Sequence, residues 1–200
     1  MNDQRDPGKT RQRLLMAAYE EIHLKGFQAA SLSAILQKAE LTKGAMYHHF
    51  PNKKALGLAV VDEVFPAVFQ EAFFAHFASR NNFVDGFLYA LEEDMKKNGE
   101  MLVAQGCPVA NLAQEMSPID EDFRVSVNAM FQKFIGNLKR ELIKGQQAGN
   151  VREDVDAGTT ALFIGASMEG CVNLSKASSS IAMFRQCGDG LKQYVKTLRA

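Results

Sequence analysis

The sequence contains few cysteines and no long apolar run. Its three cysteines, Cys107, Cys171 and Cys187, are widely spaced and form no CxxC or Cys/His ligand pattern. We therefore predict a reducing compartment and no structural zinc. Nowhere do 18 apolar residues follow one another, and the polar N-terminus lacks the apolar segment of a signal peptide. These absences predict a cytoplasmic protein that does not enter a membrane.

Signatures of catalysis and of β-structure are missing as well. The sequence has no GxSxG, HExxH, phosphate-binding glycine loop or paired-carboxylate motif, so it predicts no enzyme, no catalytic residues, no metal site and no cofactor. No stretch alternates apolar and polar residues with period two or carries a hairpin turn signal. Because 46% of the 200 residues are hydrophobic, the chain can bury a core, and we predict an all-α fold.

Charge is distributed unevenly although the formal net charge is zero, which alone would argue against nucleic-acid binding. Residues 1–54 contain nine Lys or Arg and five Asp or Glu, whereas the rest of the chain contains 14 and 18. Positive charge is thus concentrated in the N-terminal quarter, as expected of a DNA-binding segment followed by an acidic body.

A helix-turn-helix is predicted within residues 31–56, SLSAILQKAELTKGAMYHHFPNKKAL. Ser31 and Thr42 each precede a run with helical spacing, where a hydroxyl can cap a helix N-terminus. Leu32, Ile35, Leu36 and Ala39 share one face, over which Leu41 and Met46 can close. The second helix is about 10 Å long and suits a major groove about 12 Å wide. Its outward residues would be Lys43, Gly44, Ala45, Tyr47, His48 and His49.

The run Thr42–Lys53, TKGAMYHHFPNK, resembles the DNA-binding segment of the TetR family of transcriptional regulators. The resemblance covers about the first quarter of the chain. It implies a three-helix DNA-binding domain at 1–52 and a larger helical effector-binding and dimerisation domain at 53–200. Glu40 occupies the turn position where the family usually has Gly, which predicts a non-glycine residue at positive φ at a cost of about 1 kcal/mol.

The same resemblance implies a homodimer on a palindromic double-stranded DNA operator, most simply as a repressor. Tyr47 and His49 would contact phosphates, Lys43, Gly44, Ala45 and His48 would face bases, and Lys53 would contact the DNA backbone. The full predicted set is Lys9, Thr10, Arg11, Ser31, Thr42, Lys43, Gly44, Ala45, Tyr47, His48, His49 and Lys53. The alternative for the basic residues is that they are solvent-exposed and make no specific contact.

The resemblance also implies a small-molecule effector of unknown identity, bound between the middle helices. Phe and Met side chains at helical spacing are the candidates, although such a stripe is more often plain core. The candidates are Phe65, Phe69, Met95, Met101, Cys107, Met130, Phe134, Phe163 and Met168. The segment Gly106–Glu115 resembles a branch whose members sense electrophiles or oxidants through cysteine, and a helix N-terminus would lower the pKa of the Cys107 thiol.

Two alternatives for function and for Cys107 stay open at this point. Cys107 is either a redox sensor that switches the repressor or a thiol that only fills space. The alternative to a DNA-binding repressor is a TetR-like interaction protein that acts through a protein partner.

Starts and stops of the remaining helices follow from local signals. Residues 1–8 are predicted as a flexible arm. A helix begins near Lys9 or Thr10 and ends at Gly26, and Asn52 caps a helix that Pro66 either kinks or breaks. Further helices are predicted at Phe83–Asn98 with Gly99 as the stop, at Pro108–Met116, from Ser117-Pro118 to Gly149, after Asp156, and after Ser178–Ser180. The last two helices, with Gly165, Ala166 and Gly170, would form a four-helix interface with a second copy.

Overall fold

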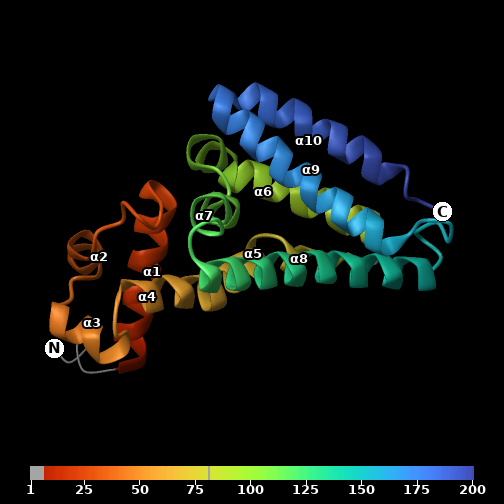
Figure 1. Cartoon of the computed structure of the whole chain (residues 1–200). Coiled ribbons are helices and arrows are strands. Elements are labelled where there is room, and N and C mark those ends of the chain that lie inside the picture. The colour runs from red at the N-terminus through yellow and green to blue at the C-terminus, as the bar shows by residue number, and fades with distance from the viewer. Residues whose placement is uncertain (1–6, 81) are drawn as a thin grey trace. The chain divides into compact units, whose positions relative to one another are not determined.

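The computed structural model describes residues 7–80 and 82–200, and every regular element in them is helical, as predicted (Figure 1). Most of the arm predicted at the N-terminus lies outside the described residues, and Pro7 and Gly8 already belong to the first helix. The elements are α1 (Pro7–Lys25), α2 (Leu32–Ala39), α3 (Lys43–His49), α4 (Lys53–Ala59), η2 (Val60–Val64), α5 (Phe65–Ala72), η3 (Phe74–Ser79), α6 (Phe83–Gln105), α7 (Pro108–Met116), α8 (Glu121–Gln147), α9 (Ala157–Ser178) and α10 (Ile181–Lys196).

The chain forms two compact units. Unit 1 comprises residues 1–67 and 108–130, and unit 2 comprises residues 68–107 and 131–200. The predicted functional boundary after residue 52 does not coincide with this division, because α4, α7 and the start of α8 pack with the N-terminal helices. The boundary after residue 52 therefore stays a prediction of where the DNA-binding part of the chain ends, and it does not mark a compact unit.

Local capping explains the helix-turn-helix in unit 1. Ser31 Oγ accepts a hydrogen bond from Ala34 N at 3.1 Å, and Thr42 Oγ1 accepts one from Ala45 N at 3.2 Å. Each hydroxyl satisfies an N–H that the helix itself cannot pair. Glu40 has φ 51° and ψ 47°, the left-handed conformation expected at this turn.

The segment after Asn52 is neither one kinked helix nor two simple ones. Asn52 Oδ1 accepts from Ala55 N at 2.8 Å and starts α4, as predicted. The chain then passes through the π-helical turn η2, and Pro66 is the second residue of α5. A proline lacks the N–H of a regular helical bond, and a π-turn is a common way to absorb such an irregularity.

Two predicted boundaries are wrong. Gly99 does not end a helix, since α6 continues to Gln105 and stops at Gly106, which has φ 82°. Instead, Gly99 makes room for α10, because a Cβ there would lie 3.3 Å from Cε1 of Phe184. The long helix α8 begins at Glu121 rather than at Ser117-Pro118. Asp120 Oδ1 accepts from the N–H groups of Asp122 and Phe123, at 3.0 and 3.3 Å, and so caps it.

Unit 2 is built around a phenylalanine cluster. Phe73 contacts the rings of Phe74, Phe77, Phe87 and Phe134, with centroids 5.3 to 6.1 Å apart. Helices α9 and α10 pack side by side against the same core (Figure 1). They contribute the aliphatic residues Ala157, Ala161, Ile164, Leu191 and Val195 to it, beside others from α6 and α8.

A disulfide joins α9 to α10, which the sequence did not predict. Cys171 and Cys187 are 16 residues apart, and their Cα atoms lie 5.5 Å from each other. The turn between two packed antiparallel helices brings them together, so spacing along the chain gave no signal. Cys107 is buried and is not part of a disulfide.

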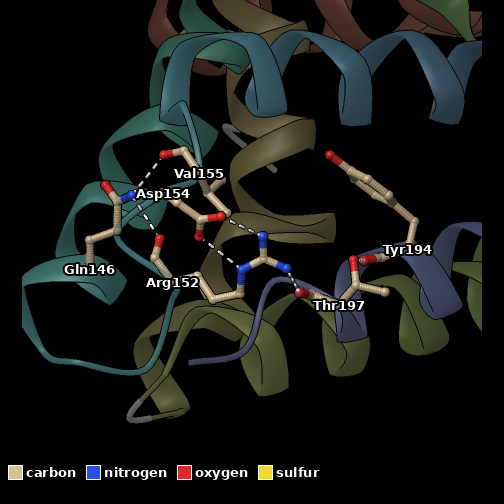
Figure 2. Close-up of polar contacts among 6 residues, drawn as sticks. All are labelled: Gln146, Arg152, Asp154, Val155, Tyr194 and Thr197. Atoms are coloured by element: carbon tan, nitrogen blue, oxygen red, sulfur yellow. Dashed lines mark hydrogen bonds and ion pairs between the residues drawn. The ribbon is translucent and has the colours of Figure 1, made fainter.

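The connection between α8 and α9 is held by its own polar contacts (Figure 2). Gln146 Nε2 donates to the carbonyl oxygens of Arg152 and Val155, at 3.1 and 2.8 Å. The Arg152 guanidinium binds the Asp154 carboxylate at 2.7 Å and donates to the carbonyl of Thr197 at 3.1 Å. The loop is therefore fixed both to α8 and to the end of α10.

Of the helices in the described ranges 7–80 and 82–200, none combines the length and the apolar character needed to cross a lipid bilayer.

Candidate DNA-binding interface

Helix α3 has one buried face and one exposed face. Met46 is 0% exposed and Phe50, which ends the helix, is also buried, so these two side chains anchor α3 to unit 1. Tyr47 is 47% exposed, and Lys43 and His48 are exposed as well. The polar residues predicted to meet DNA thus point away from the core.

The exposed face of α3 concentrates hydrogen-bond donors. Lys43 Nζ lies 5.8 Å from the centroid of the Tyr47 ring, and the rings of His48 and His49 are 5.1 Å apart. Burial lowers the pKa of His49, and the neighbouring charges of His48 and Arg11 lower it further. Among residues 7–80 and 82–200, a Cβ added to Gly44 would have only Thr42 Oγ1 within 4 Å, at 3.9 Å, so this part of the helix is open to a close approach.

The start of α1 is less available to DNA than its basic sequence suggested. Thr10 is buried, and Lys9 is exposed. Arg11 forms a bidentate ion pair with Glu63, in which its two terminal nitrogens lie 2.5 and 2.6 Å from the carboxylate oxygens. Its Cζ lies 5.0 Å from the centroid of the Phe50 ring. The pair raises the pKa of Arg11 and lowers that of Glu63. Arg11 therefore links α1 to η2 and to the end of α3, a role that the sequence did not reveal.

Lys53 and Ser31 also have partners within unit 1. Lys53 Nζ donates to the carbonyl of Gln28 at 3.1 Å and lies 4.7 Å from the Phe27 ring centroid. Burial lowers the pKa of Lys53, and the charge of Glu115 partly opposes this shift. Ser31, besides capping α2, has its hydroxyl 3.1 Å from that of Ser33.

The predicted effector residues are divided between the two units. Phe65 and Met130 are buried in unit 1, whereas Phe134 belongs to the core of unit 2 and Phe69, Met95 and Met168 pack against it. Met101 is half-buried and Cys107 is buried. Phe163 is exposed and meets the Tyr194 ring edge-on, with centroids 4.8 Å apart.

Comparison with known proteins identifies the family. Residues 14–60 match the model described as "Bacterial regulatory proteins, tetR family", and residues 88–188 match "Tetracyclin repressor-like, C-terminal domain". The chain belongs to the TetR family. TetR regulators bind DNA operators and act as dimers, and this chain is a DNA-binding transcriptional regulator with a helix-turn-helix.

Individual relatives agree over most of their length. The transcriptional regulator AcuR of Cereibacter sphaeroides is 28% identical over 86% of this chain and 78% of its own. The HTH-type transcriptional repressor NemR of Escherichia coli is 26% identical over 69% of each chain. A TetR regulator from Chloroflexus aurantiacus has a TM-score of 0.83 at 26% identity over 98% of both chains. The reduced form of NemR has a TM-score of 0.81 over 96% of this chain and 97% of its own, at 24% identity, a likeness of fold.

Proposed function

We propose that this TetR-family regulator is a homodimeric repressor that leaves a palindromic operator when a small molecule binds to it. The observation that carries the proposal is the two-sided helix α3, with Met46 buried and Lys43, Tyr47 and His48 exposed. A short helix of this kind can enter a major groove and present side chains to base edges. NemR, a relative named as a repressor, supports repression rather than activation.

Exposed apolar side chains on α9 and α10 support the homodimer. Leu162, Phe163, Leu174 and Met183 are large, apolar and exposed, and Gly170 has open space around it. Paired with a second copy, the two helices would form a four-helix interface. Gly165 does not join this face, because it lies against Phe134 and Ile135 of α8. Two-fold symmetry would then place two α3 helices about 34–36 Å apart, one turn of DNA.

Release of the operator requires a difference in affinity, not merely tight binding of the effector. To weaken operator binding 100-fold, an effector must prefer the non-binding conformation by about 2.7 kcal/mol. A molecule that binds both conformations equally would leave the protein on DNA.

Operator selection with variants of α3 tests the proposal. Lys43→Ala and His48→Ala should each change which sequence is preferred, because a base contact discriminates by about 1–3 kcal/mol. Lys133→Ala, an exposed change on α8 outside the interface, is the control. An equal loss of affinity on every sequence would contradict base reading by these residues. A wild-type protein that shows no salt-dependent binding to any duplex would contradict the function itself.

Modification of Cys107 by an electrophile or oxidant is the alternative switch. NemR, a relative 26% identical to this chain, has a solved structure described as a reduced form, which supports this alternative. Against it stands geometry: Cys107 is buried, and a buried thiol is shielded from reagents. Unchanged operator affinity after treatment with a thiol-modifying electrophile would exclude this alternative.

A further inference from the structure

A polar groove on unit 2 contains none of the predicted effector residues. It consists of two adjoining pockets of about 190 and 270 Å³, which share Phe77, Glu141 and Lys144. By comparison with about 30 Å³ per molecule in liquid water, each is large enough for a ligand on the order of ten non-hydrogen atoms. The groove lies between η3 and α8, and its apolar wall includes Phe77 and Phe83, which are buried.

Positive charge predominates along this groove. Arg80 and Lys144 line the smaller pocket, and Arg140 and Lys144 line the larger one. Glu141 is the carboxylate that faces both, and Lys144 Nζ lies 2.6 Å from its Oε1. Arg80, Arg140 and Lys144 together outnumber this one carboxylate, so the groove carries a net positive charge that favours an anion.

We propose that the groove binds a small organic acid, with its carboxylate toward Arg80 and Lys144 and its apolar body against Phe77 and Phe83. Such an acid is the class of effector for the repressor, a role that rests on the proposed function. The binding site itself is a property of unit 2 and can be measured without DNA.

Titration of the full-length protein with four related probes tests the chemistry. Mandelate carries a phenyl ring, a carboxylate and a hydroxyl, and we expect saturable binding on the order of 1 mM or tighter. Phenylacetate keeps the ring and the carboxylate and should bind about as well as mandelate, whereas mandelamide lacks the charge and should bind about tenfold more weakly. Phenyl phosphate tests the other source of negative charge, and tighter binding of this probe than of mandelate would overturn the assignment to carboxylic acids.

Variants with opposite expected effects separate the site from general damage to the fold. Lys144→Ala should weaken mandelate binding about tenfold, whereas Glu141→Gln should tighten it several-fold by removing the opposing carboxylate. Lys133→Ala, on the same helix but outside the groove, should leave binding unchanged. Equal binding by the Lys144 and Lys133 variants, or no saturable binding of any probe, would overturn the proposal.

Operator binding provides a separate readout. Mandelate added to the protein–operator complex should release DNA from wild type, and release from Lys144→Ala should need about tenfold more. If the wild-type protein binds the operator but binds no probe, this inference is wrong and the repressor function stands. If it binds the probe but no operator, the groove is a binding site and the repressor function is wrong.

Discussion

Glu115 of α7 holds the backbone of Phe27, in the turn that leads into the helix-turn-helix. Its Oε2 accepts a hydrogen bond from Phe27 N at 2.7 Å, and its Oε1 accepts one from Gln28 N at 2.8 Å. The preceding Gly26 has φ +81°, and a Cβ there would lie 2.8 Å from Glu115 Oε2. Glycine is thus required for the conformation and for the close approach of the carboxylate.

Glu115→Ala is predicted to destabilise unit 1. The change removes two charge-assisted hydrogen bonds and leaves the part-buried N–H of Phe27 without its acceptor, so we expect a loss of about 2–3 kcal/mol in the free energy of unfolding. Urea unfolding measures it, with the exposed Gln114→Ala on the same helix as the control. Because the turn leads into α2, operator affinity should fall as well. Equal stability of the two variants would show that the carboxylate does not hold the turn.

Lys53→Ala is predicted to weaken binding to all DNA sequences alike. If Lys53 moves from the carbonyl of Gln28 to a phosphate, its loss should reduce the slope of log affinity against log salt by about one per subunit contact. Fluorescence anisotropy at several salt concentrations, on the operator and on an unrelated duplex, provides the measurement. A changed preference between the two duplexes would assign Lys53 to base reading instead.

The parts of the fold that were predictable depend on neighbouring residues in the sequence. Ser31, Thr42 and Asn52 cap helices that begin at the next residue, and the alternation of buried and exposed residues in α3 follows from helical period. The polar, exposed face of the candidate interface could therefore be predicted from the amino-acid sequence alone.

What could not be predicted depends on residues far apart in the chain. Arg11 pairs with Glu63, 52 residues away, and no local pattern distinguishes it from an arginine that faces DNA. Gly99 resembles a helix stop in the sequence, because nothing nearby indicates the approach of Phe184. The effector candidates rest on periodicity, which identifies apolar faces but not which of them leave space between them.

Glu169→Gln is predicted to stabilise the protein increasingly as pH rises. Burial raises the pKa of Glu169 above its ordinary value of 4.5, and a hydrogen bond with Cys107 partly opposes the shift. The folded state then holds the proton more tightly than the unfolded state, so the stability it contributes is full below the unfolded pKa and is lost as pH rises through the folded pKa. Glutamine cannot ionise and escapes that loss.

Thermal unfolding of Glu169→Gln and wild type, between about pH 4 and pH 8, measures this effect. The melting temperatures should be similar at the acidic end, and the variant should gain steadily toward neutral pH. The exposed Glu153→Gln is the matched control for removal of one carboxylate. A constant difference between Glu169→Gln and wild type across the range would contradict ionisation as the cause.

Reduction of the disulfide is predicted to destabilise unit 2, and the loss of stability should not depend on Cys107. The bond between Cys171 and Cys187 closes a loop with a sequence separation of 16. A closed loop of this size lowers the entropy of the unfolded chain and so stabilises the folded state by about 3 kcal/mol. Urea unfolding with and without dithiothreitol should show that loss in wild type and in Cys107→Ser. Cys187→Ser lacks the disulfide, so it should be less stable than wild type from the start. Its free energy of unfolding should be the same with and without dithiothreitol. An equal response of Cys187→Ser to reductant would place the redox sensitivity elsewhere in the chain.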